Sequence, residues 1–138
     1  MKKSNMLQFS CHGDQRGWLV AIEGNQDIPF DIKRIFYIFG SDNTVVRGRH
    51  ANRNSEFVLI NVCGSCRVRT EELDGEIQEF VLDKPHTGIY IPRMVWKDMY
   101  DFSKDSILLC LSSEHYDNGE YIRDHDVFLK ELSIHNGN

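Results

Sequence analysis

Short runs of β-branched and aromatic residues, each ended by turn residues, recur along most of this chain of 138 residues. Asp74-Gly75 separates two of these runs at the spacing of a hairpin, and Gly40-Ser-Asp-Asn43 ends another. Regularly spaced short strands predict an antiparallel β-sandwich or barrel and argue against a βαβ fold, in which helices would alternate with the strands. The predicted strands are residues 18–22, 35–39, 47–52, 57–62, 65–71, 78–82, 87–91 and 106–112.

Only the end of the chain has a helical pattern. Residues 121–132 place apolar side chains among charged ones at a spacing that a modest amphipathic helix can use, with a break near Asp124. Residues 133–138 are expected to form a frayed tail. Because the sequence contains neither an internal repeat nor a linker, residues 1–138 are predicted to form one domain.

The charge distribution restricts the classes of partner. The formal net charge is −5 and the sequence contains no block of lysine and arginine, which argues against a nucleic-acid partner but leaves room for one phosphorylated ligand. No apolar run approaches membrane-spanning length, and the N-terminal segment lacks the apolar core of a signal peptide. We therefore expect a cytoplasmic protein without membrane contact, and the four sparse cysteines agree with a reducing compartment.

The segment 47–56 gathers an unusual number of polar groups directly before an apolar run. In an extended strand, alternation would place Gly48, His50 and Asn52 on one face and Arg47, Arg49 and Ala51 on the other. Gly48 has two explanations of equal weight, which are the close approach of a ligand to the backbone and a β-bulge. The pattern predicts a site at the rim of a β-structure.

The spacing Gly48-x-His50-x-Asn52-x3-Glu56-x7-Gly64 resembles the first motif of the cupins, which are small double-stranded β-helix or jelly-roll proteins. Metal-binding cupins have two histidines and a glutamate here and a further histidine in a second motif. This chain has Asn52 at the second position and Lys97 in the region of the last histidine. An amide and an ammonium group are poor substitutes for imidazole ligands, so we expect no metal.

A closer resemblance, to the nucleotide-sugar 3,4-ketoisomerases, covers nearly the whole chain. It implies an all-β fold, an antiparallel cupin jelly roll with a short C-terminal helix, and a homodimer without a cofactor. It also implies the conversion of dTDP-4-keto-6-deoxyglucose to its 3-keto isomer, on the way to dTDP-3-amino-3,6-dideoxyhexoses of bacterial surface glycans such as the O-antigen of lipopolysaccharide. The resemblance rests on Asp14-x-Arg-Gly-x-Leu-Val-Ala-Ile-Glu23, Ile28-Pro-Phe-x-Ile-Lys-Arg34, Tyr37-Ile-Phe39, Arg47-Gly-x-His-Ala51, Gly88-x-Tyr-Ile-x-x-x-Val-Trp96, Met99-x-Asp-Phe-Ser103 and Tyr121-Ile-Arg123.

The family resemblance implies that His50 is the base that removes the C3 proton, a role that suits an imidazole because both of its protonation states are accessible. Lys97, Arg47 or Tyr37 would stabilise the enediolate oxygen by charge or hydrogen bonding. Each also has a structural interpretation: Tyr37 as a core aromatic, Arg47 as a surface charge, and Lys97 as the ion-pair partner of Asp98 or Asp101.

Further residues are candidates for binding the substrate. The amide of Asn52 would orient a sugar hydroxyl, and Tyr100 would pass a proton between oxygens. Guanidinium groups match phosphate oxygens, and aromatic rings can stack on thymine, although Trp96 fits a core position equally well. The candidates for binding the diphosphate are Arg16, Arg49 and Arg93, and the candidates for stacking on the thymine ring are Tyr90 and Trp96.

Two other functions remain open. One is a nucleotide-sugar 3,5-epimerase on the same scaffold, and the other is a cupin that binds a nucleotide sugar without catalysis. The second arises because the ketoisomerases often have His-Ala-His and Trp-His-Glu-Met-His where this chain has His50-Ala-Asn52 and Trp96-Lys-Asp-Met-Tyr100. The configuration at C4 of the product, which separates the gluco and galacto series, is also open.

Overall fold

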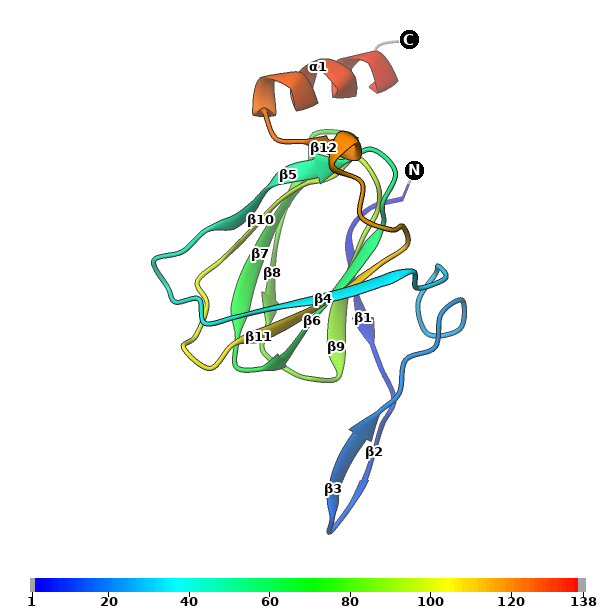
Figure 1. Ribbon diagram of the computed structural model, residues 1–138, viewed down its shortest axis with the longest axis vertical. Coiled ribbons are helices and arrows are strands. Elements are labelled where there is room, and N and C mark those ends of the chain that lie inside the picture. The colour runs from blue at the N-terminus through cyan, green and yellow to red at the C-terminus, as the bar shows by residue number, and fades with distance from the viewer. Residues whose placement is uncertain (1, 137–138) are drawn as a thin grey trace.

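The structure is a computed structural model that describes residues 2–136, and antiparallel β-sheet is the main secondary structure in this part of the chain. Figure 1 shows two sheets that face each other, a hairpin that projects from them, and one helix across one end. The elements are β1 Asn5–Gln8, β2 Cys11–Asp14, β3 Gly17–Val20, β4 Arg34–Phe39, β5 Arg47–Asn52, β6 Phe57–Cys63, β7 Cys66–Glu71, β8 Ile77–Leu82, β9 Thr87–Ile91, β10 Trp96–Tyr100, β11 Ile107–Ser112, the 3₁₀ helix η1 Asn118–Glu120, β12 Tyr121–Ile122 and α1 His125–Asn136.

The two main sheets have five strands each, in the orders β1-β9-β6-β11-β4 and β12-β5-β10-β7-β8. Their inner faces enclose the main core, to which Phe57, Leu59 and Leu108 contribute from the first sheet and Val68 and Met99 from the second. Burial of these apolar side chains provides the main driving force for folding. The predicted all-β class with a C-terminal helix is confirmed.

The first sheet is also partly covered on its outer face. Side chains alternate along β6, so Phe57 and Leu59 face the main core while Val58 and Ile60 pack in a second cluster. Phe9, Ile28 and Phe30 come from the segments before and after the projecting hairpin and belong to this cluster. This cluster explains why β6 is apolar at nearly every position.

The C-terminal region differs from the prediction. Residues 121 and 122 do not begin a helix but form β12, which pairs with Asn52 and Ala51 of β5. The helix begins after Asp124, whose carboxylate accepts a hydrogen bond from the Asp126 N–H at 2.9 Å and caps the first turn. It continues to Asn136, through most of the segment expected to fray, and residues 137–138 lie outside the described part of the chain.

Four strands were not predicted from the sequence, namely β1, β2, β10 and β12. Strands β2 and β3 form a separate two-stranded sheet that projects beyond the rest of the fold (Figure 1). The Trp18 and Leu19 side chains of this hairpin are 76% and 60% exposed.

No helix in residues 2–136 has the length and apolar character needed to cross a lipid bilayer.

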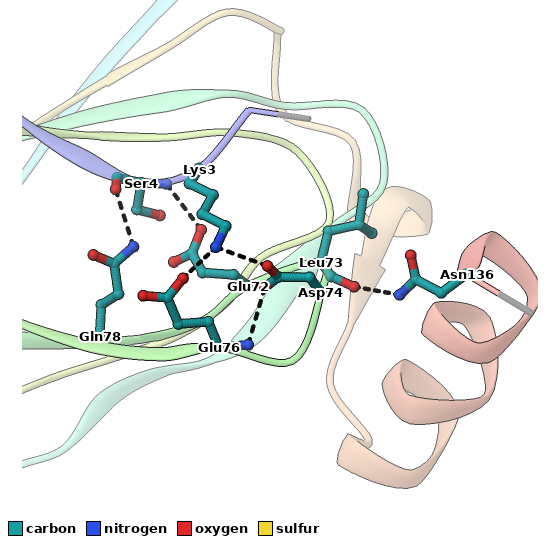
Figure 2. Close-up of polar contacts among 8 residues, drawn as sticks. All are labelled: Lys3, Ser4, Glu72, Leu73, Asp74, Glu76, Gln78 and Asn136. Carbon is teal, nitrogen blue, oxygen red and sulfur yellow. Dashed lines mark hydrogen bonds and ion pairs between the residues drawn. The ribbon is translucent and has the colours of Figure 1, made fainter.

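Polar contacts tie both ends of the described chain to the turn between β7 and β8 (Figure 2). The Ser4 backbone N–H donates to the buried carboxylate of Glu72 at 2.8 Å. Lys3 forms ion pairs with Asp74 and Glu76, and the side chain of Asn136 donates to the Leu73 carbonyl. The N-terminal segment and the helix therefore close the same end of the sandwich.

Candidate active site

A cavity of about 120 Å³ opens between the two main sheets and contains a histidine beside three basic side chains. Strands of both sheets contribute to it, so the cavity exists only because the sheets face each other. Its walls combine charged groups with apolar core residues. They consist of Arg34, Phe36, Ile38, Arg47, Gly48, His50, Phe57, Leu59, Lys97, Met99, Cys110 and Tyr121.

A β-bulge in β5 decides which side chains reach this cavity. Lys97 pairs with His50 and Asp98 pairs with Gly48, so Arg49 is an extra residue in the ladder. Gly48 and Arg49 have φ angles of 84° and 56°. A Cβ on Gly48 would lie 2.8 Å from the Lys97 carbonyl oxygen, so the bulge requires glycine there.

The bulge corrects the predicted alternation along this strand. Arg47 was expected on the face opposite His50, but both side chains line the cavity. Arg49 instead lines a shallow groove on the outer face of the sheet, together with Asp98 and Tyr100. Of the two explanations for Gly48, the structure contains the bulge.

His50 is held in its neutral form. Burial is the main cause, and the nearby positive charge of Lys97 adds to it, so the pKa of His50 falls to about 3. Its ring lies 4.9 Å from the ring of Tyr121, measured between centroids. At neutral pH the imidazole therefore has a lone pair available to accept a proton.

Lys97 points into the interior with only 3% of its surface exposed. Its Nζ donates to the Asn52 side-chain oxygen at 3.0 Å and lies 4.8 Å from the centroid of the Phe57 ring. Burial lowers the pKa of Lys97 to about 7, while the carboxylate of Glu120 acts in the opposite direction. The ion pairs considered for Lys97 are made by other residues: Asp101 with Arg67 and Asp98 with Arg69.

Arg34 and Tyr121 line the cavity with hydrogen-bonding side chains, and neither was among the predicted site residues. The Arg34 guanidinium donates to the Tyr121 hydroxyl at 3.4 Å and lies 4.4 Å from the Phe36 ring centroid. The position of Arg34 could have been predicted from β4, because residues two apart on a strand share one face of the sheet and Phe36 faces inward. Tyr37 has the opposite parity, is 62% exposed and stacks on Phe39 outside the cavity.

Asn52 and Tyr90 are buried and do not line the cavity. Asn52 is 1% exposed and its oxygen is occupied by Lys97. Tyr90 packs in the outer cluster of the first sheet and donates a hydrogen bond to Glu56. Asn52 therefore presents no free surface to a ligand in this single chain, and Tyr90 borders only a separate hollow that Glu56 and Arg93 also line.

The remaining predicted binding residues are dispersed over the surface. Arg16 lies at the tip of the projecting hairpin and forms an ion pair with Asp14 at 2.6 Å. Arg93 is exposed in the connection between β9 and β10. Trp96 packs under the helix against Phe128, and Tyr100 lines the outer groove. The structure therefore unites His50, Lys97 and Arg47 and separates them from Arg16, Arg93, Trp96 and Tyr100.

The chemistry of the cavity is that of proton transfer near negative charge. A neutral imidazole can accept a proton from carbon, and adjacent ammonium and guanidinium groups can stabilise an oxyanion in a site shielded from water. Among residues 2–136, no three His, Cys, Asp or Glu side chains are grouped so that they could hold a metal ion.

Sequence comparisons place this geometry in a known context. Residues 2–133 match the family model described as FdtA: WxcM-like, C-terminal. The chain is 44% identical over 132 residues to the TDP-4-oxo-6-deoxy-alpha-D-glucose-3,4-oxoisomerase of Aneurinibacillus thermoaerophilus. That alignment covers 95% of this chain and 94% of the relative.

Solved structures have the same fold. A variant of the QdtA 3,4-ketoisomerase from Thermoanaerobacterium thermosaccharolyticum, in complex with TDP-4-keto-6-deoxyglucose, superimposes with a TM-score of 0.93 at 36% identity, covering 99% of this chain and 98% of that one. The dTDP-4-dehydrorhamnose 3,5-epimerase of Bacillus anthracis gives a TM-score of 0.75 at 14% identity, covering 86% and 76%. The second similarity demonstrates a shared fold only.

Proposed function

The chain belongs to the FdtA: WxcM-like, C-terminal family, and on this premise we propose that it is a 3,4-ketoisomerase of a TDP-linked 4-keto-6-deoxy sugar. The observation that carries the proposal is the cavity, in which the neutral imidazole of His50 lies among the cationic groups of Lys97, Arg47 and Arg34. Such a cavity suits a reaction that needs one base and the stabilisation of one developing negative charge.

His50 acts as the base in this proposal. It removes the proton from C3, beside the C4 ketone, and the electron pair of the C–H bond forms the enediolate. The oxygen at C3 then loses its proton and becomes the new ketone, while a proton is added to C4 and the oxygen at C4 becomes a hydroxyl. No redox partner is required, because the oxidation of C3 balances the reduction of C4.

Lys97 supplies positive charge to the enediolate. Its ammonium group is buried beside the cavity, where a charge interacts more strongly than it would in water. Arg47 and Arg34 line the same cavity and provide guanidinium groups for the sugar oxygens or the diphosphate. We keep Tyr37, Asn52, Arg16, Arg49, Arg93, Tyr90, Trp96 and Tyr100 as weaker candidates, since none of them lines the cavity of a single chain.

We further propose that the enzyme is a homodimer. The outer face of the first sheet exposes Ile35, Tyr37 and Phe39 of β4 by 59%, 62% and 69%. Trp18 and Leu19 of the projecting hairpin are also exposed. Large apolar surfaces of this kind are typical of protein interfaces, and a second copy of the chain is the partner that the family resemblance implies.

The cytoplasm is the compartment that we propose for the reaction. All four cysteines are free thiols in the structure, including the exposed Cys63. Free thiols suit a reducing environment.

One experiment tests the proposed activity against its rivals. The purified protein is incubated with TDP-4-keto-6-deoxyglucose in deuterated water, and the ring protons are followed by NMR. Formation of the 3-keto isomer supports the proposal. Deuterium at C5 would instead identify a 3,5-epimerase, and measurable binding without any change in the sugar would identify a non-catalytic binding protein.

A further inference from the structure

Glu120 is a buried acid that the proposed reaction has not used. It is the last residue of η1 and only 4% exposed. One carboxylate oxygen accepts hydrogen bonds from the backbone N–H groups of Asn54 at 2.9 Å and Ser55 at 2.8 Å, and the other accepts one from the Ser55 hydroxyl. The carboxylate is therefore held by the turn that follows β5, the strand that carries His50.

These contacts keep Glu120 ionised. Burial alone would raise the pKa of its carboxyl group, but the hydrogen bonds from Ser55 and Asn54 outweigh burial and lower the pKa below its usual value. A buried carboxylate that is fully ionised needs a nearby positive charge or polar group to offset its desolvation.

Asn52 connects Glu120 to the cavity. The neighbour of Glu120, Tyr121, pairs with Asn52 in the β12–β5 ladder, and the Glu120 carbonyl accepts a hydrogen bond from the Arg53 N–H at 3.0 Å, so the backbone of Glu120 lies beside the end of β5. The Asn52 amide helps to lower the pKa of Glu120, although its nitrogen makes no hydrogen bond of normal geometry within residues 2–136. Its oxygen accepts from Lys97 at 3.0 Å. One end of this amide thus meets the ammonium, and the amide also contributes to the lowered pKa of the Glu120 carboxyl group.

We propose that Glu120 is a positioning residue that, through Asn52, holds Lys97 in the cavity as a charged ammonium group. This inference rests on the proposed function, because it assigns a purpose to the charge on Lys97. It also explains why Asn52 is directed toward Lys97: the amide dipole lies between a cation and an anion with its oxygen toward the cation.

The surroundings of Lys97 single out Glu120 as the opposing charge. Opposite Lys97 on β7 lies the uncharged Thr70, and the buried Glu72 beyond it accepts a hydrogen bond from the Ser4 backbone instead. Cys110 has a pKa raised to about 12, mainly by burial, and is therefore a neutral thiol at neutral pH. The other titratable or charged groups that line the cavity with Lys97 are the neutral His50, the phenol of Tyr121 and the guanidinium groups of Arg34 and Arg47.

The variant Glu120→Gln tests this role, because glutamine keeps the size and one accepting oxygen but removes the charge. Without the carboxylate, the pKa of Lys97 should fall below its value of about 7. We expect the alkaline limb of the kcat profile to move down by about one pH unit, so that activity at pH 8 falls about tenfold while activity near pH 5 stays close to wild type. Glu120→Asp, which keeps the charge, should restore most of the loss.

Glu131→Gln is the matched control, since Glu131 also lies near this end of the fold and pairs with an arginine, Arg53, but does not line the cavity. Its pH profile should equal that of wild type. An unchanged profile in Glu120→Gln would overturn the proposal, as would an equal loss of activity at every pH.

A second measurement does not depend on turnover. NMR titration of the Lys97 side-chain carbon, assigned with Lys97→Met, should give a lower pKa in Glu120→Gln than in wild type. If the wild-type protein does not isomerise the sugar, this titration still decides the link between Glu120 and Lys97. If Glu120→Gln does not fold, Asn52→Leu takes its place, and an unaltered Lys97 titration there would contradict a connection through Asn52.

Discussion

The Nζ of Lys97 lies 3.0 Å from the side-chain oxygen of Asn52, and the two residues are 3% and 1% exposed. In sequence, these are two of the three positions at which metal-binding cupins have histidines. Here they bind each other, although they are 45 positions apart in the chain. The contact leaves His50 as the imidazole of the cavity and places an ammonium beside it.

Replacing His50 with asparagine should remove catalysis while keeping the fold. Loss of a positioned general base typically lowers turnover by about 10²–10⁴-fold. We expect a loss in this range for His50→Asn, with a circular dichroism spectrum and TDP affinity close to those of wild type. Turnover above one tenth of the wild-type rate would exclude His50 as the base.

Lys97→Met should lower activity but raise the stability of the folded protein. Methionine fills a similar volume without the cost of a buried charge, but it leaves the Asn52 oxygen without its donor, which costs about 1–3 kcal/mol. We expect turnover to fall at least a hundredfold while the free energy of unfolding at pH 7 rises by about 2 kcal/mol. Urea unfolding and the NMR assay measure the two effects, and a variant that is both active and less stable would contradict the assignment.

The pH dependence of that stability difference follows from the lowered pKa of Lys97. Its pKa is 10.5 in the unfolded chain and about 7 in the folded one, so the unfolded state binds more protons between these values. The destabilisation caused by burying the charged ammonium group is complete below pH 7 and disappears as the pH approaches 10.5. The stability advantage of Lys97→Met should therefore shrink as the pH rises from 7 to 10, as measured by urea unfolding at each pH.

Gly48→Ala should disrupt the bulge that brings Arg47 and His50 together. Alanine would adopt a φ of 84° only with strain, and its Cβ would lie 2.8 Å from the Lys97 carbonyl oxygen. We expect a loss of about 2–4 kcal/mol of stability and a turnover below one tenth of wild type. Gly75→Ala is the control, because Gly75 has a similar φ of 89° but open space around it. It should cost about 1 kcal/mol and leave activity intact.

Phe39→Glu should separate the two copies of the proposed dimer. Phe39 is 69% exposed and lies on the apolar outer face of β4, away from the cavity. A charge buried in an interface without a partner is strongly unfavourable. Light scattering after size exclusion should therefore give the monomer mass of about 16.1 kDa, against twice that value for wild type. Val127→Glu, on the exposed side of α1, should leave the mass at the wild-type value.

Local sequence patterns were sufficient for much of the fold. Runs such as 57–62 and 87–91 are rich in β-branched and aromatic residues, and the structure places strands at both. Asp124 was identified as an interruption, and it is the residue that caps the helix. Strands β1 and β2 lacked such a signal, because NMLQ and CHGD acquire their extended conformation from pairing with β9 and β3.

The sequence by itself determined the strand-rich class and the helical end, and through family resemblance it proposed His50 as the base. Only the tertiary structure decided which side chains surround that base. Arg47 faces His50 because pairing with β10 creates a bulge, and Lys97 meets Asn52 because β10 lies beside β5. Glu120 of η1, a further 23 residues along the chain, binds the turn that follows β5. Strand alternation and propensity are properties of neighbouring residues, whereas the charge state of a buried group depends on distant segments that packing brings together.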